Sequence, residues 1–497
     1  MYREVKNVRQ QIFLFMFISI FTVLMVGNVS AAPLSSVNST IYVSPTGNDA
    51  NTGLTPSTAV QTISTGIGLV NDGGTVQLAS GIYNKTSANG NDVNIDISKN
   101  VIISGSSLDD TIIDALNNSQ IFHIDSGNTV LIKNIGFIEG KLQNSGGAIS
   151  NDGTLTVSNC LFADNTADNE VGGALFTHTN LTVTDCLFIN NKANSGSAIF
   201  NKGGFLAANN NVFEGNIAAT DLVQYSGGTI NNYAGTYNIT TNVFIGNTGS
   251  AIHVDNYIPQ GGIPTGLTSF TFNYIIGNTY GIYLESFEGQ TPTIGDFRIN
   301  ATNNWWGNNS NPKNYPTDIA GDVNNVLANT WLVFTLQAPI NTMPIGESVQ
   351  IIADITHNNL GQDISNIGHI QDGIPVYFTS DNGDVGTLTE TPSIINGLVN
   401  AVFTADQGTG IANISVFMFG SLVAASTQVM ITAVTPPINP PVKPGYIVIK
   451  THGIIPKNDL TIGSIGMKDT GVPLDGLLLA ILMVLGGFAV QKSRLNI

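Results

Sequence analysis

A repeat in the middle of the chain limits the possible folds more than any other feature of the sequence. Phenylalanine recurs at intervals of 25 or 26 residues and later of 31 residues. This series consists of Phe137, Phe162, Phe188, Phe213 and Phe244, and Ile275 takes the next place. An asparagine series follows three residues behind, with Asn165, Asn191, Asn216, Asn247 and Asn278. A second marker of the type Gly-Gly-Ala-Ile recurs in phase from Gly146 onward, so the sequence indicates a stack of equivalent units.

Each unit contains short segments with the alternation of a β-strand. Leu155 and Val157 alternate with polar residues, and Cys160 and Phe162 continue the apolar side after a polar break. Such short strands are not stable alone, but one coil per repeat can stack on the next coil with parallel hydrogen bonds. Equivalent residues then lie about 4.8 Å apart in ladders. We therefore predict an all-β, right-handed parallel β-helix over residues 32–330, with phenylalanines inside and asparagines at the bends.

The two cysteines of the chain occupy equivalent places in adjacent repeats. Cys160 and Cys186 would have Cα atoms close enough for a disulfide, but a parallel ladder holds their Cβ atoms near 4.8 Å, longer than a disulfide prefers. We favour two buried thiols. A disulfide remains the alternative.

Both ends of the chain have the pattern of export and anchoring signals. Basic residues precede an apolar run in 1–31, which predicts a secretory signal peptide cleaved after about Ala31, with an uncleaved membrane helix as the alternative. A proline-rich linker and membrane-proximal segment is expected over 435–471, and a transmembrane helix over 472–490, with a buried soluble helix as the alternative. Basic residues in 491–497 predict a cytoplasmic tail, so the bulk of the chain should lie outside a cell as a single-pass membrane protein.

The repeat stops near Trp331, and a second module follows over 331–434. Short alternating segments are separated by polar turns, which predicts a β-sandwich that acts as a spacer. The predicted strands are 348–355, 374–379, 397–405, 411–418 and 427–433.

Several segments resemble known surface proteins. The opening from Ile41 to Gly53 resembles the start of exported pectate-lyase-like β-helix proteins, where a short amphipathic segment caps the core, and the repeat markers resemble those of polymorphic outer-membrane proteins. The segments that begin at Gly373, Gly397 and Gly410 are similar to the bacterial Ig-like modules of invasin and intimin. The whole arrangement resembles the adhesin-like surface proteins of methanogenic archaea. This resemblance implies a displayed β-helix, an Ig-like β-sandwich and a role in adhesion.

Charge narrows the class of partner. The formal net charge is -17, and only 10% of residues are charged. Binding to nucleic acid requires clustered Lys and Arg, so nucleic acid is excluded as a partner. We expect cell-surface glycans or envelope components as partners instead, together with the membrane through the C-terminal helix.

The sequence offers two kinds of glycan-related site. Trp305 and Trp306 could stack on sugar rings, although plugging the end of the helical core is the interpretation that we favour. Glycosylation is permitted at Asn-x-Ser/Thr sequons, which are Asn38, Asn84, Asn117, Asn180, Asn238, Asn300, Asn308 and Asn413.

No set of residues in the sequence has the pattern of a catalytic site, and we expect no cofactor. Arg298 and Asp296 are a poor match to a lyase base beside bound calcium, and the histidines form no close ligand pair along the chain. Calcium could bind acidic residues of adjacent coils, namely Asp152, Asp164, Asp168 and Asp185. The leading hypothesis is a noncatalytic adhesin-like protein. The alternatives are an anchored polysaccharide lyase or glycoside hydrolase and a structural envelope component.

Overall fold

The computed structural model describes residues 39–87, 90–142, 145–219, 227–255, 268–285, 299–380, 385–390, 393–421 and 425–434. The predicted signal peptide (1–31), linker (435–471), transmembrane helix (472–490) and tail (491–497) lie outside these ranges, as does Asn38. Among the residues that the structure describes, no helix is long and apolar enough to cross a membrane.

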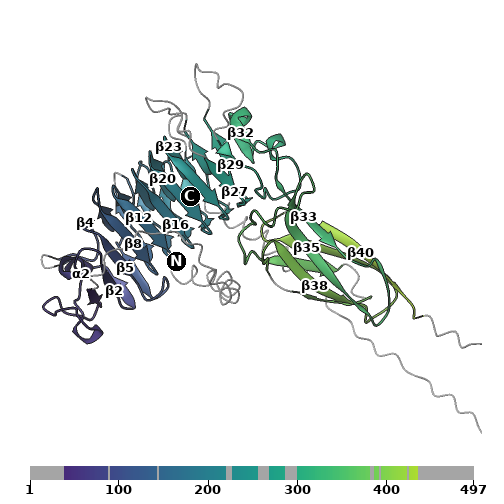
Figure 1. Ribbon diagram of the computed structural model, residues 1–497, viewed down its shortest axis with the longest axis horizontal. Helices are drawn as coiled ribbons and strands as arrows, with labels where there is room; N and C mark the ends of the chain where they lie inside the picture. Colours follow the sequence, from purple (N-terminus) through teal and green to yellow (C-terminus); the bar gives the residue numbers. More distant parts are fainter. Residues whose placement is uncertain are drawn as a thin grey trace, which may run out of the picture. The chain divides into compact units, whose positions relative to one another are not determined.

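The described residues between 40 and 327 form a parallel β-helix, whose strands stack from coil to coil in three long sheets (Figure 1). Sheet A contains β1 (Thr40–Val43), β2 (Gly74–Leu78), β5 (Val101–Ser104), β8 (Thr129–Lys133), β12 (Thr154–Ser158), β16 (Leu181–Thr184), β20 (Phe205–Asn209), β24 (Thr236–Thr240), β27 (Ser269–Thr271), β30 (Ile299–Asn300) and β32 (Val326–Leu327). Sheet B contains β3 (Gly81–Tyr83), β6 (Thr111–Asp114), β9 (Gly136–Ile138), β13 (Leu161–Ala163), β17 (Leu187–Ile189), β21 (Val212–Glu214), β25 (Val243–Ile245) and β28 (Tyr274–Ile276).

Sheet C is the third long sheet and later carries the candidate site. Its strands are β4 (Ile95–Ile97), β7 (Phe122–Ile124), β11 (Ile149–Asn151), β15 (Leu175–Thr177), β19 (Ile199–Lys202), β23 (Gly228–Tyr233), β26 (Ser250–Val254), β29 (Tyr280–Leu284) and β31 (Ile319–Gly321). A short sheet D joins β10 (Lys141–Leu142), β14 (Thr166–Ala167), β18 (Lys192–Ala193) and β22 (Ile217–Ala218). Neighbouring strands of all four sheets pair in parallel, which confirms the predicted β-helix.

In the described part of the chain, the helical segments are short and lie near the ends of the stack. The helix α2 (Ile63–Leu69) is capped by Thr62, whose hydroxyl accepts a hydrogen bond from the backbone of Thr65, and it buries Ile63 and Ile67 in the core of the β-helix. This is the capping segment expected at the first coil. The remaining helical turns are η1 (Pro56–Thr58), η2 (Pro312–Asn314) and η3 (Val323–Asn325).

The phenylalanine ladder, defined as Phe137, Phe162, Phe188, Phe213 and Phe244, lies inside the β-helix. Its rings stack in parallel with centroids 4.7–5.0 Å apart, and all five side chains are fully buried. One coil beyond Ile275, Trp306 belongs to the same core. The register of the strands therefore places the repeat's large apolar residues in one continuous stack.

The asparagine ladder, defined as Asn165, Asn191, Asn216, Asn247 and Asn278, follows sheet B at a bend. Asn191 is representative: its Oδ1 accepts hydrogen bonds from the backbone and the side-chain amide of Asn165. Its Nδ2 donates to the carbonyl of Phe162 and to Asn216 Oδ1. The ladder thus satisfies backbone groups that the bend would otherwise leave without partners.

A second ladder lies at the other end of the sheet B strands, at the bend that precedes each of them. Its members are Cys160, Cys186, Asn211, Asn242, Asn273 and Asn304. Asn211 Oδ1 accepts from the backbone of Cys186, as the other asparagines do for their neighbours. Both cysteines are buried free thiols, as expected.

Residues 332–432 form two four-stranded sheets with a shared apolar core. One sheet contains β33 (Leu332–Gln337), β35 (Ser348–Asn358), β38 (Leu398–Thr404) and β37 (Thr387–Glu390). The other contains β34 (Thr342–Pro344), β40 (Ala425–Thr432), β39 (Gly410–Met418) and β36 (Val376–Ser380). All the pairs are antiparallel except β34 with β40, so the module is a β-sandwich.

Candidate functional site

The outward face of sheet C carries polar, titratable and aromatic side chains in two rows. Residues of the first outward row pair in register from coil to coil: Asp96, His123, Ser150, Phe176, Phe200, Asn231, His253, Tyr283 and Ala320. The second outward row lies two residues further along each strand and contains Asp125, Asp152, His178, Lys202, Tyr233, Asp255, Glu285 and Asp322. The residue between the two rows points inward, because side chains of a strand alternate between its faces.

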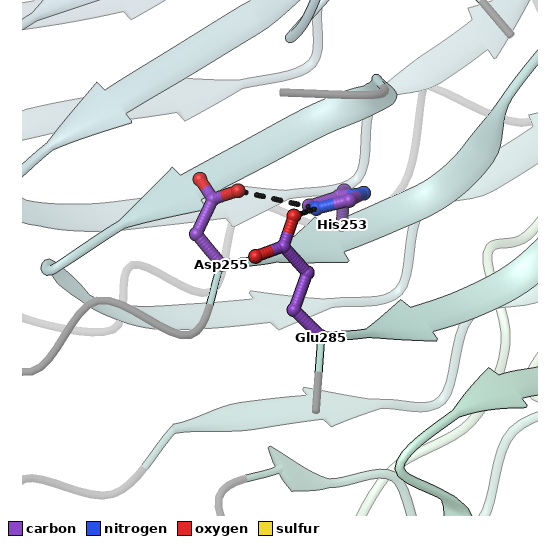
Figure 2. Close-up of side chains that lie close together, drawn as sticks. All are labelled: His253, Asp255 and Glu285. Atoms are coloured by element: carbon purple, nitrogen blue, oxygen red, sulfur yellow. Dashed lines mark hydrogen bonds and ion pairs between the residues drawn. The ribbon is translucent and has the colours of Figure 1, made fainter. Parts of the chain in front are cut away.

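A buried cluster lies near the C-terminal end of this face. His253 Nε2 lies 3.2 Å from Asp255 Oδ1 and 3.2 Å from Glu285 Oε1, as Figure 2 shows. The side chains of His253, Asp255 and Glu285 are 1%, 4% and 22% exposed. His253 and Asp255 come from one coil and Glu285 from the next, since β26 and β29 are paired neighbours.

The electrostatics of this cluster favour a charged imidazole. Burial by itself lowers the pKa of His253, but hydrogen bonds and charge attraction from Asp255 and Glu285 outweigh burial and raise that pKa. The ring of Tyr283 stacks on the imidazole with centroids 5.1 Å apart and an interplanar angle of 18°. The imidazole is therefore held both by its carboxylate neighbours and by an aromatic ring.

An exposed cluster lies on the earlier coils of the same face. His178 Nδ1 is 2.7 Å from Asp152 Oδ1, and His123 Nε2 is 3.8 Å from Asp152 Oδ2 and 3.3 Å from Asp125 Oδ1. These four side chains are between 32% and 45% exposed, so solvent reaches all of them. Alternating carboxylates and imidazoles offer hydrogen-bond acceptors and donors to a ligand on the surface.

Aromatic rings lie between the two clusters. Phe176 packs edge-on against His178 with centroids 4.7 Å apart, and it stacks with Phe200 at 5.8 Å. Tyr233 continues the stack at 6.5 Å from Phe200. Phe176 and Phe200 are buried although they point outward from the sheet, so they support the polar side chains around them.

The structure buries both tryptophans, but only Trp306 lies in the core of the β-helix as the plug interpretation expects, whereas Trp305 belongs to the apolar cluster that includes the core of the β-sandwich. Trp305 and Trp306 are 0% and 4% exposed, so neither presents a ring face to a sugar. Trp306 packs in the core of the β-helix, and Trp305 contacts Phe334 edge-on with centroids 6.1 Å apart. Stacking of sugar on these rings is not what the structure shows.

The acidic residues considered for calcium lie at different turns of the coil. Asp152 follows a strand of sheet C, whereas Asp164 follows sheet B. Asp168 follows a strand of sheet D and pairs with Lys141 at 2.8 Å, and Asp185 follows sheet A. These four side chains therefore do not form one site.

The sequon asparagines that the structure describes all reach the surface. Asn84, Asn117, Asn180 and Asn238 are exposed, and Asn300, Asn308 and Asn413 are half-buried. Arg298 and Asp296, considered for lyase chemistry, lie outside the described residues.

Sequence reasoning missed the clusters on sheet C, although a signal exists. A His-x-Asp tripeptide occurs at His123–Asp125 and again at His253–Asp255, each time at the end of a strand of sheet C. The partner residues Asp152 and Glu285 come from the following coil at the same register. A search along the chain cannot find such pairs, but aligning the coils by the repeat would have placed them side by side.

Comparisons with known proteins support no transfer of function. No protein-family model matches the sequence, and a search of curated proteins gives no match. Among solved structures, a PL6 family polysaccharide lyase from Pseudopedobacter saltans is similar with 13% identity and a TM-score of 0.29, over 53% of this chain and 62% of that chain. Two structures of the S-layer protein SbsC are similar over 22% of this chain, with 14% and 15% identity and TM-scores of 0.17 and 0.18. These two matches span 56% and 14% of the SbsC chains, so this chain covers less than two thirds of each of the three structures.

Proposed function

We propose that this protein is a noncatalytic, cell-surface adhesin-like protein that binds a glycan along the outward face of sheet C. The observation that carries the proposal is the exposed cluster of His123, Asp125, Asp152 and His178, which lies in register over three successive coils.

The chemistry of the exposed cluster suits a polyhydroxylated ligand. Carboxylates accept hydrogen bonds from hydroxyl groups, and such charge-assisted bonds are among the stronger ones. His178 is held between Asp152 and the edge of Phe176, so its orientation is fixed before a ligand binds. Equivalent positions repeat with each coil, about 4.8 Å apart, and carry polar groups in the exposed cluster, which fits a linear polymer that runs along the stack.

The negative charge of the chain disfavours anionic glycans as ligands. A formal net charge of -17 repels anionic polymers, and the exposed cluster contains two carboxylates. We therefore propose a neutral or amino-substituted glycan as the ligand.

The cell-surface setting is part of the proposal and rests on sequence pattern. The leader in 1–31 and the apolar run in 472–490 support export and anchoring. The β-sandwich, whose segments resemble bacterial Ig-like modules, would serve as a spacer between the β-helix and the membrane.

An array of neutral, amino-substituted and anionic polysaccharides, probed with the purified full-length protein, tests the proposal. We expect saturable binding with the polymer left intact. Asp152→Asn should weaken binding by about tenfold to a hundredfold, because a hydrogen bond to a charged group contributes about 1.5–3 kcal/mol. Asp185→Asn is the matched control, since it removes the same charge from the exposed turn after sheet A on a neighbouring coil and should leave binding unchanged.

Three results would contradict the proposal. Shortening of the polymer would show an enzyme, absence of binding would favour a structural envelope component, and equal binding by Asp152→Asn would place the site elsewhere.

A further inference from the structure

We infer that His253, Asp255 and Glu285 form a binding site for a divalent cation of the zinc or manganese class. Figure 2 shows the three side chains converging from two adjacent coils, with the imidazole facing both carboxylates. The inference is independent of glycan binding, because the exposed cluster that carries the proposed function consists of other residues on other coils.

The separations between the three groups match those within a coordination shell. Nε2 of His253 is 3.2 Å from Asp255 Oδ1 and 3.2 Å from Glu285 Oε1, and the ligand atoms of all three residues lie within 4.8 Å of one another. Metal bonds of about 2.0–2.2 Å at tetrahedral or octahedral angles place ligand atoms about 3.0–3.5 Å apart. The imidazole nitrogen is therefore separated from each carboxylate oxygen by the distance expected between two ligands of one cation.

The donor set selects the class of metal. Calcium and magnesium prefer shells made of oxygen, whereas an imidazole nitrogen suits zinc and neighbouring transition metals. Two ionised carboxylates carry a charge of -2 together, and a divalent cation would take the place of the His253 proton between them, since only the neutral imidazole ligates a metal. No cysteine lies in this group, which argues against metals that need thiolate ligands.

An independent observation comes from the adjacent coil. Asn231 is the register partner of His253 and leaves the sheet on the same side, because its neighbour Ile230 points into the core. Asn231 is fully buried, and among the residues that the structure describes neither its Oδ1 nor its Nδ2 has a hydrogen-bond partner.

A buried amide without partners costs free energy, so its presence calls for an explanation. Parallel pairing of β23 with β26 places the Cα atom of Asn231 about 4.8 Å from that of His253, and both side chains leave the sheet on the same side. Asn231 Oδ1 is the fourth donor that a tetrahedral site would need, alongside the imidazole and the two carboxylates.

Supporting contacts fix the ligands before a cation binds. Tyr283 stacks on the imidazole of His253 with centroids 5.1 Å apart, and Val254, which lies between His253 and Asp255 in the chain, is anchored in the core. Metal ligands held by such contacts lose little freedom on binding, which favours affinity.

The test is a titration of the chelator-treated, full-length protein with MnCl₂ and with ZnCl₂, followed by electron paramagnetic resonance for manganese and by calorimetry for zinc. We expect one cation per chain, and a melting temperature that rises with the cation present. Glu285→Gln keeps the shape of the least buried ligand, so it should fold and should lower the affinity by at least tenfold. Asp255→Asn should act in the same direction.

Asn231→Leu tests the fourth donor, since it keeps the approximate volume but removes the amide oxygen. It should also lower the affinity, and circular dichroism verifies the fold of each variant. Asp152→Asn, in the exposed cluster, is the control that should bind the cation as the unchanged protein does. Saturable binding to neither cation, or unchanged affinity in both Glu285→Gln and Asp255→Asn, would overturn the inference. Loss of binding in Asp152→Asn alone would move the site to the exposed cluster and would overturn it as well.

Discussion

Removal of one side chain from the asparagine ladder should destabilise the β-helix far more than a surface change beside it. Asn191→Ala deletes four hydrogen bonds, two accepted from Asn165 and one each donated to Phe162 O and Asn216 Oδ1. The backbone N–H of Asn165 and one N–H of its side chain then lie buried without acceptors. At about 1–3 kcal/mol for each such donor, the expected loss of stability is about 2–6 kcal/mol.

Hydrogen exchange is the suitable assay, because coils of a repeat protein can open locally without global unfolding. A loss of about 2 kcal/mol corresponds to roughly thirtyfold faster exchange of the Asn165 amide, since each 1.4 kcal/mol is a factor of ten. Asn190→Gly is the control: Asn190 is exposed and has a φ of 55°, so glycine fits the same backbone and should change stability by less than about 0.5 kcal/mol. Equal exchange in the two variants would refute the reasoning, because it would show that the ladder contributes nothing beyond surface contacts.

Three further predictions concern the core, the thiols and a buried carboxyl. The ring of Phe188 stacks between two others, with centroids 4.9 and 4.8 Å away. Phe188→Ala should therefore lower the free energy of unfolding, measured by urea denaturation, by about 3–5 kcal/mol. A decrease no greater than that caused by Phe188→Leu would contradict the packing argument. Burial raises the pKa of the Cys186 thiol, and Cys160 is equally buried. A thiol reagent should therefore react with two thiols only after the protein unfolds. If no thiol reacted in the unfolded chain, the two cysteines would form a disulfide. Burial raises the pKa of Asp318 from 3.8 to about 7, so the folded state binds a proton that the unfolded state releases, and stability should fall as pH rises from about 4 through 7. Thermal melting should show a weaker fall over this pH range in Asp318→Asn, and the same slope in both proteins would contradict the assignment.

The repeat makes the β-helix predictable because each coil repeats the same packing problem. Phe162 and Asn165 recur in phase, and one ladder of each type follows from stacking. The second ladder was missed because cysteine replaces asparagine in two coils. Cys186 and Asn211 both stand two residues before a phenylalanine of the ladder, but the difference in residue type hides the hydrogen bond that joins them. The residue type changes from cysteine to asparagine along this ladder, while the place of the residue in the coil stays the same.

The β-sandwich was predicted less completely for a similar reason. Its longer strands alternate clearly, but the edge strands β34 and β37 are short and carry little pattern of their own. The strand β35 extends to Asn358, beyond the predicted end at Ile355, because pairing with β33 continues to that residue. Tertiary pairing, rather than local alternation, sets these boundaries.

The buried cluster could not be read from spacing along the chain. His253 and Glu285 are separated by a full coil, and the interval between register partners in sheet C varies from 22 residues (Asn231 to His253) to 37 residues (Tyr283 to Ala320). Only the register of sheet C makes them neighbours.

The most direct test of the central claim is nuclear magnetic resonance of the histidine rings during titration with the glycan that the array selects. Histidines mark both modules, since His123 and His178 lie in the exposed cluster of sheet C and His357 and His369 lie in the β-sandwich. We predict that the ring signals of His123 and His178 shift in a saturable way, that those of His357 and His369 do not, and that the polymer keeps its length. Shifts confined to His357 and His369, or a polymer that shortens during the titration, would contradict the account.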